Sequence, residues 1–384
     1  MNIVSRKQCE FFGFTENHEH ESILIFHECS SNLNVDKDRQ IGFPTCNELH
    51  TGNTPRSIMT KGNSVAIGTQ YTNFIRGNRD KLMISYRREQ SHDYTMYSAC
   101  GVLFQGEIHF FGGHDYKTDD VIFNYTDDGI DLTRQHFVIE TNRKGKLVEM
   151  TKKEDLEIGF SSPSCSSVAM TADRFPWFKT NVVILCFDLH LKKSCHSFNG
   201  QLTKIGDSNY RHWQGGLVKY KSVLLTVGGF IDNQKTEIME MDETKNFSWS
   251  IIESDFQFNL GKYQWGHSLV TVESSDINKQ FVLLIGGDNL QEGMSKNVFK
   301  FNGTWFPFGQ LNKARAIHNS IYWNGAVYVI GGANVQNFKS KTKMEIWKIK
   351  ESSDQFKTEE NWSELFRWRS SNLFIVPDAF FPDH

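Results

Sequence analysis

Proline is scarce in this sequence, with 7 residues among 384. A chain with so little proline and without a long polar tract is expected to be ordered. It has no run of about 18 apolar residues, the length that crosses a bilayer. No apolar segment typical of a signal peptide follows residues 1–7, MNIVSRK. We therefore expect no membrane insertion and a cytoplasmic protein, unless a segment missing from the N-terminus directs the chain to secretion.

The sequence also lacks an excess of positive charge, since its formal net charge is −3. Without basic residues in excess to neutralise phosphates, nucleic acid is not an expected partner. Basic clusters at 143–146 and 339–343 are interpreted as solvated loops.

Cysteine is present seven times without any CxxC spacing, at positions 9, 29, 46, 100, 165, 186 and 195. An odd number without that spacing argues against a zinc module and against a complete disulfide framework. Four Asn-Xaa-Ser/Thr sequons matter only if the chain is secreted, and they begin at Asn124, Asn246, Asn302 and Asn361.

Aromatic residues, by contrast, make up 13% of the chain, and 31 of them are Phe. Aromatic side chains favour pleated, half-buried surfaces, so the composition favours β-structure. The length suits one large all-β domain.

Residues 320–332, SIYWNGAVYVIGG, define a repeat. The segment predicts a strand, a tight turn at Asn324-Gly325, a second strand and a Gly-Gly pair, because both central residues of a type I′ turn need positive φ. A third strand is expected at 344–349 and a fourth near Trp362. Three other segments end in the same pair: Gly112-Gly113, Gly228-Gly229 and Gly286-Gly287. Two degenerate copies span 57–68, with one glycine of the pair, and 167–187, with none.

Every copy opens with a small residue followed by an aliphatic one: Ser57-Ile58, Gly101-Val102, Ser167-Val168, Gly216-Leu217, Ser268-Leu269 and Ser320-Ile321. A small side chain suits the first strand of a propeller blade, which lines a crowded central channel. The glycine pair suits a sharp turn where neighbouring blades approach. Trp249, Trp305 and Trp362 follow in three copies, where a large ring on an outer strand can fill the gap between blades.

Together these features resemble the kelch-repeat family. The resemblance covers roughly residues 52–366 and is sharpest in the repeats that hold Gly112, Gly228, Gly286 and Gly331. It implies an all-β, kelch-type β-propeller. No BTB, BACK or F-box segment precedes the repeats, so we expect a single propeller over 1–384.

The two ends of the chain are expected to form a composite closing blade from residues 1–51 and 367–384. In this blade 371–376 is the first strand, 11–14 the end of the second, 22–26 the third and 41–43 the fourth. Mixing the termini in one sheet hides the sheet edges. Counting this blade favours seven blades over six. In the alternative, residues 1–50 pack outside a six-bladed ring.

No catalytic constellation is visible, so we expect no enzyme, no cofactor and no metal. His18 and His20 share a strand face but lack a third ligand. Cys195 and His196 are adjacent, and adjacent strand residues point to opposite faces, so they do not form a nucleophile–base pair. The sequence has no P-loop, no GxGxxG after a strand and no GxSxG. The copper site of kelch-type oxidases finds no matching residues either.

The candidate binding residues lie near the starts of first strands, at one mouth of the channel: Arg211, His212, His267, Arg315 and His318. The alternative for them is ordinary hydrogen bonding between loops and strands. We expect a monomeric protein-interaction scaffold that binds a protein partner through the variable loops after the glycine pairs. Two other hypotheses stay open. One is a small-molecule, sugar-type enzyme, which requires these side chains to converge, and the other is a secreted surface protein.

Overall fold

The computed structural model describes most of the chain between residues 99 and 333 and shorter segments on either side. The described residues are 21–29, 69–78, 81–88, 99–105, 107–113, 134–141, 147–160, 164–172, 175–187, 193–229, 235–240, 247–253, 265–289, 293–323, 325–333, 344–348, 356–358 and 371–377. They consist mainly of β-strands, with a short 3-10 helix, η6 (Ile277–Lys279). No helix in these ranges is long and apolar enough to cross a membrane.

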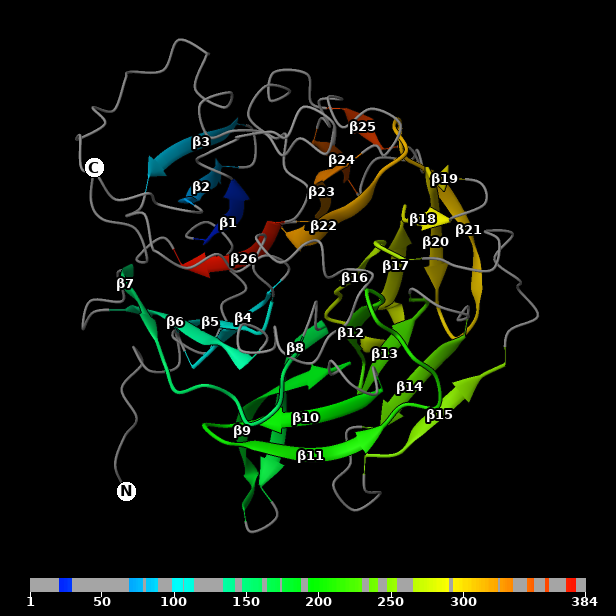
Figure 1. Ribbon diagram of the computed structural model, residues 1–384. Helices are drawn as coiled ribbons and strands as arrows, with labels where there is room; N and C mark the ends of the chain where they lie inside the picture. The colour runs from blue at the N-terminus through cyan, green and yellow to red at the C-terminus, as the bar shows by residue number, and fades with distance from the viewer. Residues whose placement is uncertain are drawn as a thin grey trace, which may run out of the picture.

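The strands of the described residues form six antiparallel sheets of four strands each (Figure 1). We number the sheets 1 to 6 and give their strands from first to fourth. Sheet 1 consists of β26 (Ser371–Pro377), β1 (Glu21–Cys29), β2 (Thr69–Asn78) and β3 (Lys81–Arg88). Sheet 2 consists of β4 (Cys100–Phe104), β5 (Glu107–Phe111), β6 (His136–Thr141) and β7 (Leu147–Lys152). Sheet 3 consists of β8 (Ser164–Ala172), β9 (Phe175–Cys186), β10 (Ser194–Phe198) and β11 (Leu202–Asp207).

The second half of the chain builds the other three sheets. Sheet 4 consists of β12 (Gly216–Tyr220), β13 (Val223–Val227), β14 (Thr236–Glu240) and β15 (Trp249–Ile252). Sheet 5 consists of β16 (Ser268–Val272), β17 (Phe281–Ile285), β20 (Asn297–Phe301) and β21 (Trp305–Gln310). Sheet 6 consists of β22 (Ala316–Trp323), β23 (Ala326–Ala333), β24 (Glu345–Lys348) and β25 (Lys357–Thr358). A small hairpin, β18 (Asp288–Asn289) and β19 (Gly293–Met294), follows β17.

The first strands of the sheets contact one another in a continuous series. β4 contacts β8, β8 contacts β12, and the series continues through β16, β22 and β26 back to β4. Figure 1 shows these strands near a common centre, with β7, β11, β15 and β21 on the outside. The all-β prediction is confirmed, and the arrangement is propeller-like.

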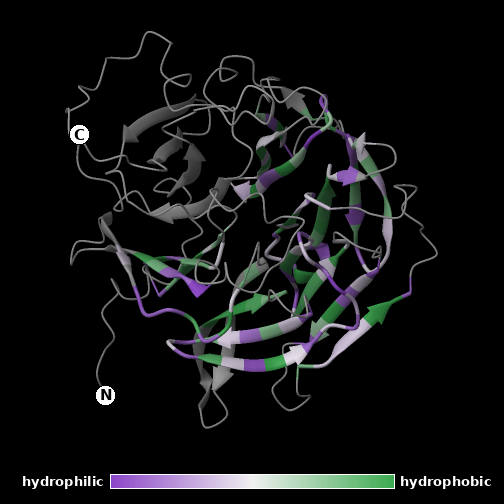
Figure 2. Cartoon of the chain, viewed as in Figure 1, coloured by the Kyte–Doolittle hydropathy of each residue, from purple (hydrophilic) through white to green (hydrophobic). Residues whose placement is uncertain are grey.

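Apolar residues fill the space between neighbouring sheets, and this is why the second strands are hydrophobic on both faces. In β17, residues 282–285 are fully buried. By contrast, the outer strand β11 mixes half-buried and exposed residues, and Figure 2 shows both hydrophobic and hydrophilic positions along it. A strand packed between two layers buries both faces, whereas an outer strand leaves one side in water.

Trp305 illustrates how an outer-strand ring closes the gap between two sheets. It begins β21 of sheet 5 and is almost fully buried, in one cluster with Leu225 and Val227 of sheet 4. Its Nε1 donates a hydrogen bond of 2.8 Å to Oγ1 of Thr236, also in sheet 4. The role predicted for this tryptophan is confirmed. Trp249 packs against the cluster that joins sheets 3 and 4, and Trp362 lies outside the described residues.

The small residues that open the repeats lie on first strands, as the sequence predicts. Gly101, Ser167, Gly216, Ser268 and Ser320 belong to β4, β8, β12, β16 and β22, whereas Ser57 lies outside the described residues. At Gly216, a Cβ would come within 2.5 Å of Cγ of Leu269 on the next first strand. The first strands are therefore too close together for a larger side chain at this position.

The first glycine of each pair has a left-handed backbone. Its φ lies between 59° and 75° at Gly112, Gly228, Gly286 and Gly331. In the repeat without glycines, Phe187 takes the equivalent place after β9 with a φ of 70°. A left-handed conformation is unfavourable for a residue with a Cβ. The fold therefore keeps this turn even where the sequence supplies no glycine.

The two ends of the chain meet in sheet 1, but not in the predicted order. β26 occupies the first position, as expected for 371–376, and β1 pairs with it directly, Leu24 opposite Phe374. β1 is therefore the second strand and not the third, and β2 and β3 follow it. The prediction placed residues 11–14 and 41–43 in this blade, and both segments lie outside the described residues. The described residues form six four-stranded sheets, one fewer than the seven blades that the sequence favours.

Candidate functional site

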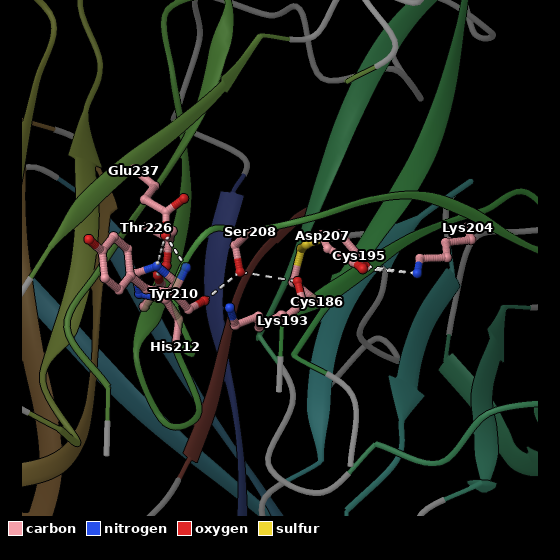
Figure 3. Close-up of a disulfide and its surroundings, with 11 residues drawn as sticks. Cys186, Lys193, Cys195, Lys204, Asp207, Ser208, Tyr210, His212, Thr226 and Glu237 are labelled. Carbon is pink, nitrogen blue, oxygen red and sulfur yellow. Dashed lines mark hydrogen bonds and ion pairs between the residues drawn. A yellow bond between two sulfur atoms is a disulfide. The ribbon is translucent and has the colours of Figure 1, made fainter. Parts of the chain in front are cut away.

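A buried carboxylate holds the segment that enters sheet 4. Glu237 on β14 is fully buried, and its Oε2 accepts hydrogen bonds of 2.8 Å from the backbone N–H and from Nδ2 of Asn209. Its Oε1 accepts the backbone N–H of Tyr210 at 2.8 Å and lies 2.9 Å from Nε2 of His212 (Figure 3). Nδ1 of His212 lies 2.7 Å from the carbonyl oxygen of Gly228. Both ring nitrogens of His212 thus face oxygen atoms.

Sheet 6 repeats this arrangement with an arginine in place of the histidine. Oε2 of Glu345 accepts the backbone N–H of Asn312 at 2.6 Å and its Nδ2 at 3.2 Å, and Oε1 accepts the backbone N–H of Lys313 at 3.3 Å. Nη2 of Arg315 pairs with the same Oε1, and Nη1 donates to the carbonyl oxygen of Gly331 at 3.0 Å. Arg315 therefore corresponds to His212, because each ties a glutamate to the first glycine of its own sheet.

Burial and pairing act in opposite directions on these charges. Burial raises the pKa of the Glu237 carboxyl, but hydrogen bonds from His212 and Asn209 outweigh it, and the pKa lies below its ordinary value. Burial lowers the pKa of the Arg315 guanidinium, and Glu345 opposes that shift. An arginine stays charged in proteins, so the Arg315–Glu345 contact is a buried ion pair.

The other two candidate histidines are buried and neutral near pH 7. Burial lowers the pKa of His267 to about 4. Burial, followed by the charge of Arg315, lowers the pKa of His318 well below its usual value. Nε2 of His318 lies 2.9 Å from Oγ of Ser268, which also accepts a hydrogen bond of 2.9 Å from Oγ of Ser320. This chain of hydroxyl and imidazole groups links the first strands of sheets 5 and 6.

The five predicted residues therefore have different surroundings. Burial is the largest cause of the lowered pKa values of His267 and His318, and the nearby His212 and Arg315, respectively, lower them further. These four residues therefore lie near one another. Arg211 has an exposed side chain instead. Nε2 of His212 and Nη2 of Arg315 are engaged with glutamates of their own sheets. Binding of a ligand by these residues stays a prediction.

Sequence reasoning missed the two glutamates and the two asparagines that accompany them. The signal was present: Asn209 lies three positions before His212, and Asn312 three before Arg315. In each repeat a glutamate follows on the third strand. Comparison of the two segments side by side would have indicated one shared structural motif.

Two disulfides were also not predicted. Cys100 on β4 is bonded to Cys165 on β8, across sheets 2 and 3, with the Cα atoms 6.0 Å apart. Cys186 on β9 is bonded to Cys195 on the adjacent β10 within sheet 3, and both cysteines are fully buried (Figure 3). The bond removes Cys195 as a nucleophile, in agreement with the sequence-based rejection of a Cys195–His196 pair.

Among the described His, Cys, Asp and Glu residues, no group of three or more could hold a metal ion. His18 and His20 lie outside the described residues.

Comparisons with known proteins inform the fold. No family model and no curated protein matches the sequence. Matches are found among solved structures, in 159 chains. One of them, the structure of YjhT, has a TM-score of 0.52 and 13% sequence identity, and the match covers 76% of this chain and 91% of that one. At this identity the likeness concerns the fold alone. The chain has an all-β, propeller-like fold.

Proposed function

We propose that this chain is a kelch-type β-propeller of six blades that serves as a protein-binding scaffold and acts as a monomer. Three observations support this architecture: the continuous series of contacts between first strands, the pairing of β26 with β1 and the recurring left-handed turn after the second strand. Sheet 1 is the closing blade in this proposal. A ring closed in this way leaves only short, protected strand edges.

The binding function is supported by the connections between second and third strands. These connections differ in length, whereas the four-stranded sheets that carry them share one arrangement. Strands two and three are joined by residues 112–135 in sheet 2, 187–193 in sheet 3 and 228–235 in sheet 4. Strands within antiparallel sheets alternate in direction, so these connections all leave from the same end of the sheets, which we call the loop face. Loops of different length and charge on a rigid frame provide a specific recognition surface.

The engagement of His212 and Arg315 by glutamates supports a scaffold over the sugar-type enzyme. A site for a polar small molecule needs convergent side chains with free donors or acceptors. Nη1 and Nη2 of Arg315 and both ring nitrogens of His212 already have partners in their own sheets, and the two other histidines are neutral near pH 7. These groups are better suited to holding the entering segments of sheets 4 and 6 in place.

The two disulfides favour a secreted protein over a cytoplasmic one. Disulfides persist in oxidising compartments and are rare in the cytosol. The compartment that we propose is therefore extracellular.

The test of the scaffold is affinity capture with matched loop variants. Residues 334–343, which connect β23 to β24 in the sequence, are replaced by a Gly/Ser segment of equal length in one variant. Residues 274–279, at the opposite end of sheet 5, are replaced in the same way in the control. The proposal expects the first variant to lose proteins that the wild type and the control both retain. Identical capture by all three chains would contradict binding through the loop face.

A further inference from the structure

The turn between β20 and β21 carries a sequon that projects from the molecule. Asn302, Gly303 and Thr304 connect the third and fourth strands of sheet 5, and all three are exposed. The backbone N–H of Asn302 donates to the carbonyl oxygen of Thr304 at 3.1 Å. A Cβ added at Gly303 would meet no atom within 4 Å. The turn therefore projects into open space, although it is rigidly attached to two paired strands.

The side chain of Asn302 is held by its oxygen and not by its nitrogen. The hydroxyl of Tyr220, on β12 of the neighbouring sheet, donates to Oδ1 of Asn302 at 3.4 Å. In the described part of the chain, the contacts of Asn302 involve its backbone N–H and Oδ1, and none involves Nδ2. Nδ2 is the atom that N-linked glycosylation modifies. Its modification removes no contact that the fold uses.

We propose that Asn302 carries an N-linked glycan. The inference rests on the secretion proposed above, for which the two disulfides are an independent indication. In the reaction, Nδ2 of Asn302 forms a bond to C1 of a sugar supplied by a lipid-linked oligosaccharyl pyrophosphate. The bond from C1 to the pyrophosphate oxygen breaks, the lipid pyrophosphate leaves with the electron pair, and the amide proton passes to a base of the transferase. The hydroxyl of Thr304 completes the acceptor motif.

The position of the turn determines what the glycan leaves uncovered. Connections between third and fourth strands leave from the end opposite to the loop face, because strand direction alternates within each sheet. Asn302 and the connection 286–296 thus lie at opposite ends of sheet 5. A glycan at Asn302 therefore covers the back of the propeller-like ring, including the exposed turn, and leaves the loop face accessible to a partner.

Mass spectrometry of the tryptic peptide 301–313 tests the proposal. The full chain is isolated from the organism that produces it, and in parallel from a eukaryotic secretory host, where both the secreted and the cell-retained fractions are analysed. Intact glycopeptides are detected directly, because an Asn-Gly sequence can deamidate spontaneously and mimic enzymatic release. We expect most of this peptide to carry a hexose- and N-acetylhexosamine-containing glycan. An unmodified peptide in the natural chain, or in both fractions from the host, would overturn the proposal.

Three variants distinguish the effect of losing the glycosylation motif from the effect of altering the turn. Asn302→Gln and Thr304→Ala should each abolish the glycan on this peptide, whereas Thr304→Ser should restore it. Thr304→Ala keeps the asparagine and thus controls for effects of the asparagine substitution. All three should capture the same proteins as the wild type if the loop face binds the partner. If the variants lose the glycan and still capture the same proteins, both the loop-face proposal and the glycan proposal are supported. If the wild type carries no glycan and capture is unchanged, only the glycan proposal is overturned.

Discussion

At the scale of single residues, Gly286 shows what the first glycine of a pair contributes to the fold. Its φ is 59°, and a Cβ would lie 2.6 Å from the carbonyl oxygen of Arg315 and 2.9 Å from Cε1 of His318. The approaching atoms include backbone of the segment that enters the next sheet, and Gly287 donates a hydrogen bond of 2.9 Å to the same carbonyl. Two requirements therefore coincide there, a left-handed backbone and close approach between sheets.

Gly286→Ala should lower the free energy of unfolding by about 3 kcal/mol, because about 1–2 kcal/mol of left-handed strain is combined with displacement of a packed backbone. Gly303 provides the matched control, since it also has a positive φ, of 90°, but no atom lies within 4 Å of its Cβ position. Gly303→Ala should cost only about 1 kcal/mol, the conformational part. Urea unfolding of both variants measures the difference. Equal losses of unfolding free energy in the two variants would show that the close approach of Arg315 to Gly286 does not contribute to the cost.

At the scale of elements, the first strands are joined by more than packing. Cys100–Cys165 connects β4 to β8 across a sequence separation of 65 residues, whereas Cys186–Cys195 closes only 9. In the chain-entropy account, a disulfide stabilises by restricting the unfolded chain, more so for a longer loop. The bond between sheets is therefore expected to contribute more to stability than the bond within sheet 3.

The double variant Cys100→Ser/Cys165→Ser should lose about 4 kcal/mol of unfolding free energy, and Cys186→Ser/Cys195→Ser about 3 kcal/mol from loop entropy. The second pair is fully buried, and its serines add a desolvation cost. Ala variants of both pairs control for that cost. Chemical denaturation of the oxidised proteins gives the values. If the Ala variant of Cys186–Cys195 lost more stability than the Ala variant of Cys100–Cys165, the expectation that the longer loop contributes more would be contradicted.

The tryptophans and glycine pairs could be predicted from the sequence because each acts locally. A left-handed turn favours glycine, although Phe187 takes that place in sheet 3, and a wide gap favours a large ring such as that of Trp305. The glutamates that hold the entering segments could not be identified in this way. Glu237 is distant in sequence from Asn209 and acts only after β14 has paired within its sheet.

At the scale of the whole molecule, the pairing of β26 with β1 joins the two ends of the described chain in one sheet. The register runs from Glu21 opposite Pro377 to His27 opposite Ser371. Without β26, strand β1 would present an unpaired edge, and β22 and β4 would lose their shared neighbour. An open edge of this length is a template for association with a second chain.

Deletion of residues 371–384 should therefore cause self-association and loss of a single cooperative unfolding transition. Deletion of 378–384 is the control, because it leaves β26 intact. Size-exclusion chromatography with light scattering, combined with thermal unfolding, distinguishes the two variants. A monomeric, cooperatively unfolding chain after the longer deletion would show that closure does not depend on β26.

Buried histidines should make the whole fold sensitive to acid. Burial, followed by the charge of Lys153, lowers the pKa of His109 to about 4. Burial, followed by the charges of His109 and Lys153, lowers the pKa of His136 to about 3. The two rings are linked by a hydrogen bond of 3.0 Å. His267 is lowered to about 4 as well. In the unfolded chain each histidine takes up a proton as the pH falls through about 6.5. In the folded chain it does so only at the lower pH that its lowered pKa sets.

Between pH 6.5 and 4 the unfolded state therefore binds more protons, and stability falls as the pH is lowered. Each such histidine contributes a slope of about 1.4 kcal/mol per pH unit. Guanidinium unfolding measured at pH 7, 6, 5 and 4, with constant ionic strength, should reveal this decline. His136→Gln should flatten the slope. A stability independent of pH in this range would mean that the histidines are solvated.

The sequence by itself determined the β-class, the repeat, the small first-strand residues, the turn glycines and the position of the final strand, since all of these follow from local backbone and side-chain requirements. The tertiary structure decided the rest. It brought β1 directly beside β26, formed two disulfides among the described cysteines and paired Arg315 with Glu345. These features depend on contacts between residues far apart in the chain, and spacing along a sequence does not specify which distant groups the closing of sheets will bring together.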